Sequence, residues 1–184
     1  MRSDYRDHKS QLAIGYLEWM EALNKERFQV YFVTIMFDWN RRPPPTTYSM
    51  QLAVEGYYSA VLTRLFHRPH KRKLEKLPLL VAFIETPSEK QRAIGGGDMW
   101  GAHYHGFLAV PPNQATRKSF SQVRDAAVEV AKRAHPNLLR VHLERARDSK
   151  KIVDYAWKAR SHEGDDFSEE FDILLPKRRT ELPI

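Results

Sequence analysis

The sequence contains no cysteine, which excludes disulfide bonds and thiolate metal ligands. It has no apolar run near the length of about 18 residues that a membrane-spanning helix needs. The first residues, MRSDYRDHKSQ, have no apolar core of a secretion signal, so we expect a cytoplasmic protein without a membrane partner. A P-loop of the form GxxxxGK[ST] is also missing, which excludes a nucleotide-binding site of that type in this sequence.

The composition is that of a folded protein with a basic surface. Hydrophobic residues make up 42% and aromatic residues 11% of the 184 positions, enough for one domain with a substantial core. The formal net charge of +7 favours a polyanionic partner, most often nucleic acid. We expect a single domain over 1–184, with a core at about 27–160, a helix before it and a charged extension over 161–184.

Hydrophobic periodicity predicts alternating helices and strands. Apolar residues at helical spacing indicate helices, and dense β-branched and aromatic runs indicate strands. The resulting order is a split βαβ arrangement on an antiparallel sheet, an α+β fold of the ferredoxin-like or RRM-like kind with flanking helices. The predicted helices cover 9–25, 48–66, 119–134 and 149–160, and the predicted strands cover 27–38, 77–85, 102–110 and 137–145.

Basic residues concentrate in two predicted loops. The first follows the strand 27–38 and reads NRRPPPTT, where three prolines prevent the strand from continuing. The second is HRPHKRKLEK, residues 67–76, which is either a solvated loop, the more common case, or a phosphate-contacting surface. The candidate DNA-binding residues are Arg41, Arg42, Arg68, Lys71, Arg72 and Lys73.

Two histidines stand one residue apart at the start of the strand 102–110. Because alternate side chains of a strand share a face, His103 and His105 point the same way. Glu85 ends the preceding strand and joins them on that face if residue 85 pairs with residue 103, whereas a shift by one residue places it on the other face. Two imidazoles and a carboxylate suit Mg²⁺ or Mn²⁺ acting as a Lewis acid, and zinc also fits these ligands.

The stretch YAWK lies on the last predicted helix. Residues at i and i+3 of a helix are neighbours, so the ammonium of Lys158 would favour the phenolate of Tyr155 and could hold a phosphate. A bare Y-x-x-K pattern is more often an ordinary amphipathic helix with a half-buried tyrosine. The Y-x-x-K pattern therefore indicates a catalytic tyrosine only when other motifs accompany it.

Three motifs together resemble the HUH endonuclease superfamily, in particular the single-tyrosine rolling-circle replication initiator (Rep) branch. They are the apolar strand FVTIMFD (32–38), HYH (103–105) and YAWK (155–158). The resemblance implies nicking of single-stranded DNA at a replication origin, which can be a hairpin, through a 5′-phosphotyrosine intermediate. It further implies Tyr155 as nucleophile, Lys158 as helper, a metal on Glu85, His103 and His105, and a host helicase and polymerase as partners.

Several alternatives remain open at this point. The loop before His103 is long, so Asp98 or Glu89 could replace Glu85 as the third ligand. Single-tyrosine transposases share the motif order, and relaxases share the chemistry. An RRM-like module that holds single strands without cutting needs neither the metal cluster nor Y-x-x-K. A metal-dependent phosphoesterase that uses water would leave Tyr155 as a packing residue.

Overall fold

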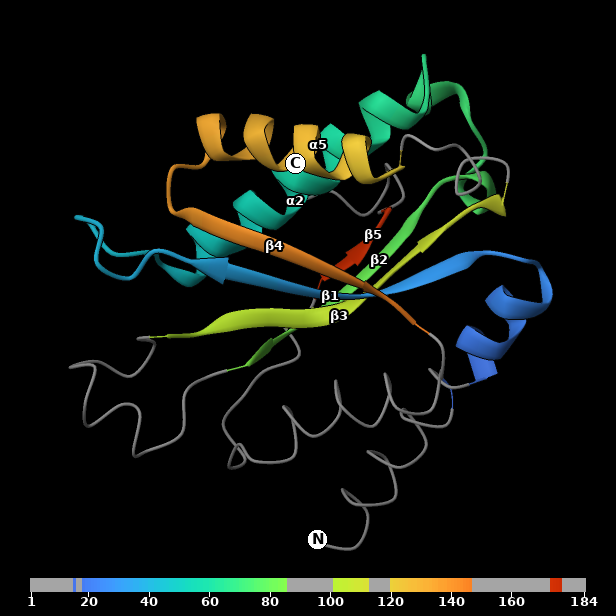
Figure 1. Cartoon of the computed structure of the whole chain (residues 1–184), viewed down its shortest axis with the longest axis horizontal. Coiled ribbons are helices and arrows are strands. Elements are labelled where there is room, and N and C mark those ends of the chain that lie inside the picture. Colours follow the sequence, from blue (N-terminus) through green and yellow to red (C-terminus); the bar gives the residue numbers. More distant parts are fainter. Residues whose placement is uncertain (1–14, 16–17, 86–100, 113–119, 147–172, 177–184) are drawn as a thin grey trace, which may run out of the picture.

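A five-stranded antiparallel sheet forms the centre of the molecule (Figure 1). The computed structural model describes residues 15, 18–85, 101–112, 120–146 and 173–176. The strands run side by side in the order β4-β1-β3-β2-β5. Their bounds are β1 Gln29–Phe37, β2 Leu79–Glu85, β3 His103–Val110, β4 Leu138–Arg145 and β5 Ile173–Leu175.

Two helices cover one face of this sheet. Helices α2 (Thr47–Leu65) and α5 (Phe120–Ala134) lie together above the strands (Figure 1). Four strands and these two helices follow one another as β1-α2-β2-β3-α5-β4, with β1 and β3 side by side in the middle. This arrangement is the predicted α+β fold with a split βαβ core, which the structure confirms. None of the helices in the described part of the chain has the length and apolar character that a bilayer crossing needs.

The main core lies between the sheet and the two helices. Helix α2 begins at a capping box, in which Thr46 and Ser49 each accept a hydrogen bond from the other's backbone N–H. From this fixed start α2 buries a continuous apolar stripe against alternate residues of the strands. The largest fully buried side chains there include Tyr57, Tyr104, Ile35, Met50, Leu80 and Leu108.

The opposite face of the sheet is only partly apolar. A smaller cluster forms where Met20 and Leu23, in the helical residues 18–25, pack on Val81 and Phe107 of the sheet. Farther along the same strands, toward the end of β2 and the start of β3, this face carries the polar side chains of Glu85, His103 and His105. One face therefore stabilises the fold, and the other divides between an apolar and a polar half.

The four predicted strands and the predicted helices 48–66 and 119–134 are found within two residues of their expected ends, with two differences elsewhere. Residues 18–25 of the predicted helix 9–25 are helical, and the start of that helix lies outside the described residues. The segment 67–76 was expected as a loop and contains two short 3₁₀ helices, η1 (Pro69–Lys71) and η2 (Leu74–Lys76). No element was predicted within the charged extension 161–184, and there the structure has strand β5, which pairs with β2 at the sheet edge. The predicted helix 149–160 lies outside the described residues.

Candidate metal centre

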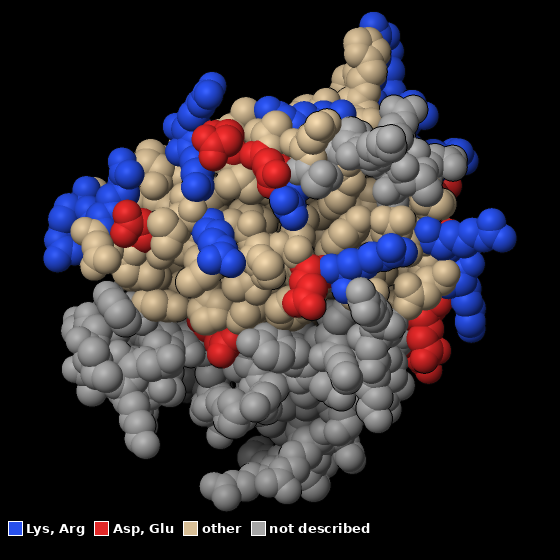
Figure 2. Space-filling view, in the orientation of Figure 1, with Lys and Arg blue, Asp and Glu red and all other residues tan. Residues whose placement is uncertain are grey.

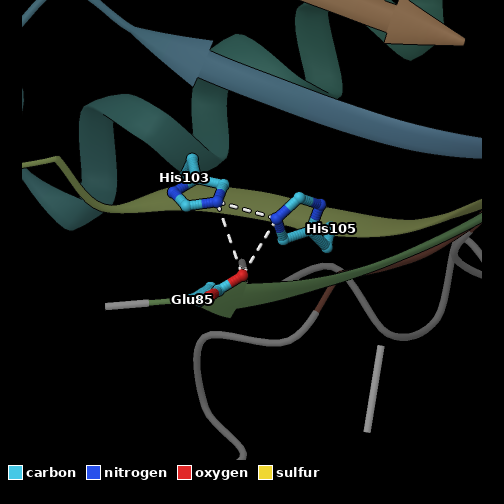
Figure 3. A group of neighbouring side chains, drawn as sticks. All are labelled: Glu85, His103 and His105. Atoms are coloured by element: carbon cyan, nitrogen blue, oxygen red, sulfur yellow. Dashed lines mark hydrogen bonds and ion pairs between the residues drawn. The ribbon is translucent and has the colours of Figure 1, made fainter. Parts of the chain in front are cut away.

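The pairing of β2 with β3 brings three metal-ligating side chains to one face of the sheet. Glu85 stands opposite His103, and Phe83 stands opposite His105. This register is the one in which the carboxylate and both imidazoles share a face. The face is the one not covered by α2 and α5, and the cluster lies in its polar half (Figures 1 and 3).

The three ligand atoms form a compact triangle (Figure 3). His103 Nε2 lies 2.7 Å from His105 Nε2 and 3.4 Å from Glu85 Oε2, and His105 Nε2 lies 2.9 Å from the same oxygen. Neighbouring ligands of an octahedral ion with bonds of about 2.1 Å stand about 3 Å apart. The residues therefore fit one face of an octahedral metal ion, and in the described part of the chain no fourth ligand group joins them.

Burial differs among the three ligands. His105 is almost fully buried, with its ring stacked on Phe32 at a centroid distance of 5.4 Å. The side chains of His103 and Glu85 keep 25% and 32% of their surface exposed. The cluster thus has a rigid base inside the sheet and a side that faces solvent, as a site that admits a substrate requires.

Hydrogen bonds within the cluster shift its pKa values. Those that Glu85 accepts from His103 and His105 hold the pKa of the carboxyl far below its usual range, outweighing the opposing effect of burial. Burial disfavours the charged form of His103, but the hydrogen bond with Glu85, the Gly101 carbonyl and the negative charge of Glu85 together raise its pKa. Glu85 is therefore a carboxylate at neutral pH, and His103 must release any bound proton before it ligates a metal.

A backbone carbonyl and a side-chain hydroxyl orient the two rings. His103 Nδ1 lies 2.9 Å from the Gly101 carbonyl oxygen, which can only accept, so this nitrogen carries the hydrogen and Nε2 is left for the metal. Gly101 has a φ of 82°, a left-handed conformation that glycine adopts without strain. On the other side, His105 Nδ1 lies 3.0 Å from Thr34 Oγ1 of β1, a hydroxyl that can donate or accept, and this contact directs Nε2 toward Glu85 and His103.

Replacing Thr34 by valine is expected to weaken Mn²⁺ binding about 10- to 100-fold. Valine keeps the branched shape and removes the oxygen that orients the His105 ring. Titration calorimetry with Mn²⁺ measures the effect, and Thr34→Ser should restore most of the affinity. Thr63→Val on α2, where the hydroxyl bonds only to helix carbonyls, is the matched control. Equal affinity of Thr34→Val and the wild type would show that the hydroxyl does not position His105.

The other predicted site residues fall into three groups. Arg41, Arg42 and the basic residues of 67–76 are exposed, on separate connections. Asp98, Glu89, Tyr155 and Lys158 lie outside the described residues. Gly101 and Trp39 were not among the predicted site residues, and Thr34 was named only within the motif FVTIMFD. No sequence signal pointed to these contacts, because each joins the cluster through a backbone carbonyl or a distant strand.

The chain matches no protein-family model, no curated protein and no solved structure in the three comparisons made.

Proposed function

We propose that this chain is a metal-dependent, site-specific DNA nickase and strand transferase of the HUH type that initiates rolling-circle replication. The observation that carries the proposal is the triangle of Glu85, His103 and His105 on a ferredoxin-like sheet, combined with Y-x-x-K later in the chain. In the proposed reaction the Tyr155 hydroxyl attacks a phosphodiester of single-stranded DNA. A tyrosyl 5′-phosphodiester forms, the bond to the 3′ oxygen breaks, and that oxygen leaves as a 3′-OH.

The ligands favour Mg²⁺ or Mn²⁺ in this role. The carboxylate and the open positions suit both ions, and the two imidazoles add a preference for Mn²⁺. When bound, such an ion would withdraw negative charge from the scissile phosphate. The protein's own groups do the rest: Glu85, His103 and His105 hold the ion, and Lys158 favours the phenolate of Tyr155.

The exposed arginines beside the cluster support contact with a phosphate backbone. Ile35 pairs with Tyr104, so the turn that follows β1 and carries Arg41 and Arg42 lies beside the start of β3. The basic segment 67–76 precedes β2, whose far end carries Glu85, so it lies at the opposite end of that strand. Basic side chains gather at these two ends in Figure 2, at the left and the upper right.

From this separation we infer different tasks for the two basic regions. In the proposed reaction Arg41 and Arg42 hold phosphates next to the cleaved bond. Six residues of strand, about 20 Å, separate the segment 67–76 from Glu85, so it would contact nucleotides or a hairpin stem farther along the DNA. The proposed partners are therefore origin DNA along this path, and a helicase and a polymerase supplied by the host.

Replacing Lys71, Arg72 and Lys73 by alanine is expected to weaken binding to all DNA strands about equally. Each lost phosphate contact should lower the slope of log affinity against log salt by about 0.7. Fluorescence anisotropy with labelled strands between low and moderate salt measures the slope. An unchanged slope would mean that the segment is only a solvated connection.

The decisive experiment looks for a covalent protein–DNA adduct. The protein is incubated with a library of labelled single strands and Mn²⁺, and products are separated on a denaturing gel. A shifted band that protease removes supports the proposal, including its transposase and relaxase variants. Cleavage that never produces an adduct would favour a phosphoesterase that uses water. Binding without cleavage would favour an RRM-like module.

A further inference from the structure

The turn after β1 is fastened to the connection between α5 and β4. The Asp38 backbone N–H donates to the Asn137 carbonyl at 2.9 Å, and the Asp38 carboxylate accepts from the Asn40 N–H at 3.1 Å. The Arg41 guanidinium donates to the Pro136 carbonyl at 3.2 Å. These contacts give the turn a defined position relative to the sheet rather than leaving it to move as an exposed loop.

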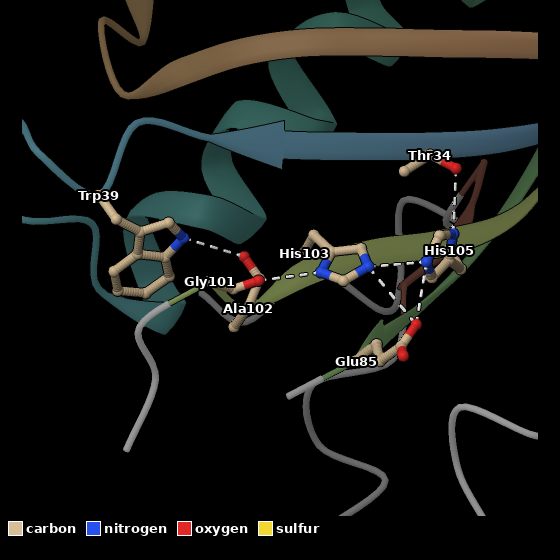
Figure 4. Close-up of polar contacts among 7 residues, drawn as sticks. All are labelled: Thr34, Trp39, Glu85, Gly101, Ala102, His103 and His105. Carbon is tan, nitrogen blue, oxygen red and sulfur yellow. Dashed lines mark hydrogen bonds and ion pairs between the residues drawn. The ribbon is translucent and has the colours of Figure 1, made fainter. Parts of the chain in front are cut away.

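Trp39 extends from this turn to the start of β3. Its indole Nε1–H donates to the Ala102 carbonyl at 3.2 Å, a contact between residues 63 positions apart (Figure 4). The ring also packs against the main core, and Ala102 itself is fully buried. Trp39 therefore connects a fixed turn with the residue directly before His103.

The hydrogen bond between the Trp39 indole and the Ala102 carbonyl lies just past the end of the pairing between β1 and β3. The last backbone pair between β1 and β3 is Ile35 with Tyr104, so His103 lies one residue beyond that ladder. The indole supplies a donor from the β1 side where the backbone no longer does. Ala102 in turn follows Gly101, whose carbonyl accepts from His103 Nδ1 at 2.9 Å (Figure 4). The indole thus holds the Ala102–His103 peptide unit, which is next to the Gly101–Ala102 unit whose carbonyl orients the His103 ring.

We propose that Trp39 is a positioning residue of the metal centre, acting through Ala102 and Gly101 on His103. The inference rests on the metal-binding part of the proposed function and is independent of DNA cleavage. Without the indole hydrogen bond, the start of β3 gains freedom and the His103 ring loses its fixed direction. Metal affinity falls because the ring must be ordered when the ion binds.

The test measures Mn²⁺ affinity by titration calorimetry in the absence of DNA. Trp39→Phe keeps an aromatic ring and removes the donor, and we expect affinity to fall about tenfold. Incorporating benzothienylalanine at position 39 replaces only the N–H by sulfur, so it should give the same loss with native packing. Trp19→Phe, which removes an indole that packs on Phe107 in the other apolar cluster, is the control and should bind normally.

A spectroscopic measurement separates positioning from a general loss of stability. With Co²⁺ as the probe, the visible absorption bands report the number and geometry of ligands. We expect them to change in both Trp39 variants and to stay unchanged in Trp19→Phe. Wild-type affinity and spectrum in the benzothienylalanine protein would overturn the role of Trp39. A wild-type protein that binds no divalent ion would instead overturn the metal site itself.

Discussion

Replacing Tyr155 by phenylalanine is expected to lower DNA nicking by at least about a thousandfold and to remove the covalent adduct. The change deletes one oxygen, which in the proposed reaction is the atom that bonds to phosphorus. The substitution keeps the aromatic ring, so Mn²⁺ affinity and strand binding should stay at wild-type values. A denaturing gel of labelled DNA measures adduct and product in the same lane.

Two variants accompany this prediction. Lys158→Ala should slow adduct formation without abolishing it, because in the proposed reaction the lysine only favours the phenolate and holds a phosphate. Tyr48→Phe is the matched control, because Tyr48 is an exposed tyrosine at the start of α2 and should not affect cleavage. If the Tyr155→Phe protein still forms an adduct with cleaved DNA, another residue is the nucleophile.

The proposed step conserves one phosphodiester bond. The bond between phosphorus and the 3′ oxygen breaks while a bond to the tyrosine oxygen forms, so the two sides are close in energy. A 3′-OH can therefore attack the phosphotyrosine and reseal the strand. This reversibility distinguishes the proposed reaction from attack by water, which would leave a free 5′-phosphate and no route back.

Much of the fold could be predicted because each element carries a strong periodic signal. The strand with Val33 and Ile35 is dense in β-branched and aromatic residues, and the helices show apolar stripes. The alternation also placed His103 and His105 on one face, because that follows from strand geometry alone. These predictions depend only on neighbours in the sequence.

The position of Glu85 relative to the histidines could not be fixed in the same way. A register shift of one residue moves Glu85 to the other face, and the long connection between β2 and β3 does not select the register. In the structure, apolar residues of β2 on both faces set it: Ala82 and Ile84 face the main core, and Val81 and Phe83 face the smaller cluster. The register between β2 and β3 therefore depends on packing against two separate clusters, and such tertiary packing cannot be inferred from the sequence of β2 alone.

The side chains that orient the histidines, Thr34 and Trp39, could not be predicted for a different reason. Thr34 and His105 are 71 positions apart, and the bond from Trp39 goes to a backbone carbonyl, which every residue has. Such contacts require no particular spacing in the sequence, so no sequence pattern indicates them. Strand β5 was missed because Ile173–Leu175 is too short for a periodic pattern and is defined by its pairing with β2.

Replacing His103 by alanine is expected to weaken Mn²⁺ binding by more than about a hundredfold, since loss of a ligand should exceed the effect of losing an orienting group. His105→Ala should do the same, although its burial also creates a cavity in the sheet. His142→Ala is the matched control. His142 pairs with Thr34 from the other side, so it lies on the same face of the sheet as His105 but two strands away.

Acidification provides a second measure of the same ligands. The raised pKa of His103 means that a proton competes with the metal, because the imidazole binds only in its neutral form. Mn²⁺ affinity in the wild type should therefore fall about tenfold for each pH unit below the pKa of His103 and be constant well above it. Glu85 does not contribute to this change, since its pKa is held far below the range tested by the hydrogen bonds from both histidines.

Titration calorimetry from about pH 5 to pH 8 separates the possible outcomes. The His142→Ala control should follow the wild-type curve, with the same affinity and the same loss in acid. His103→Ala should bind weakly at every pH and lose the part of the pH dependence that comes from this ring. Affinity that does not change with pH, or a His103→Ala protein that binds as tightly as the control, would show that the ion is not held by these imidazoles. The triangle of Glu85, His103 and His105 would then be a hydrogen-bonded cluster of the sheet without a role in metal binding.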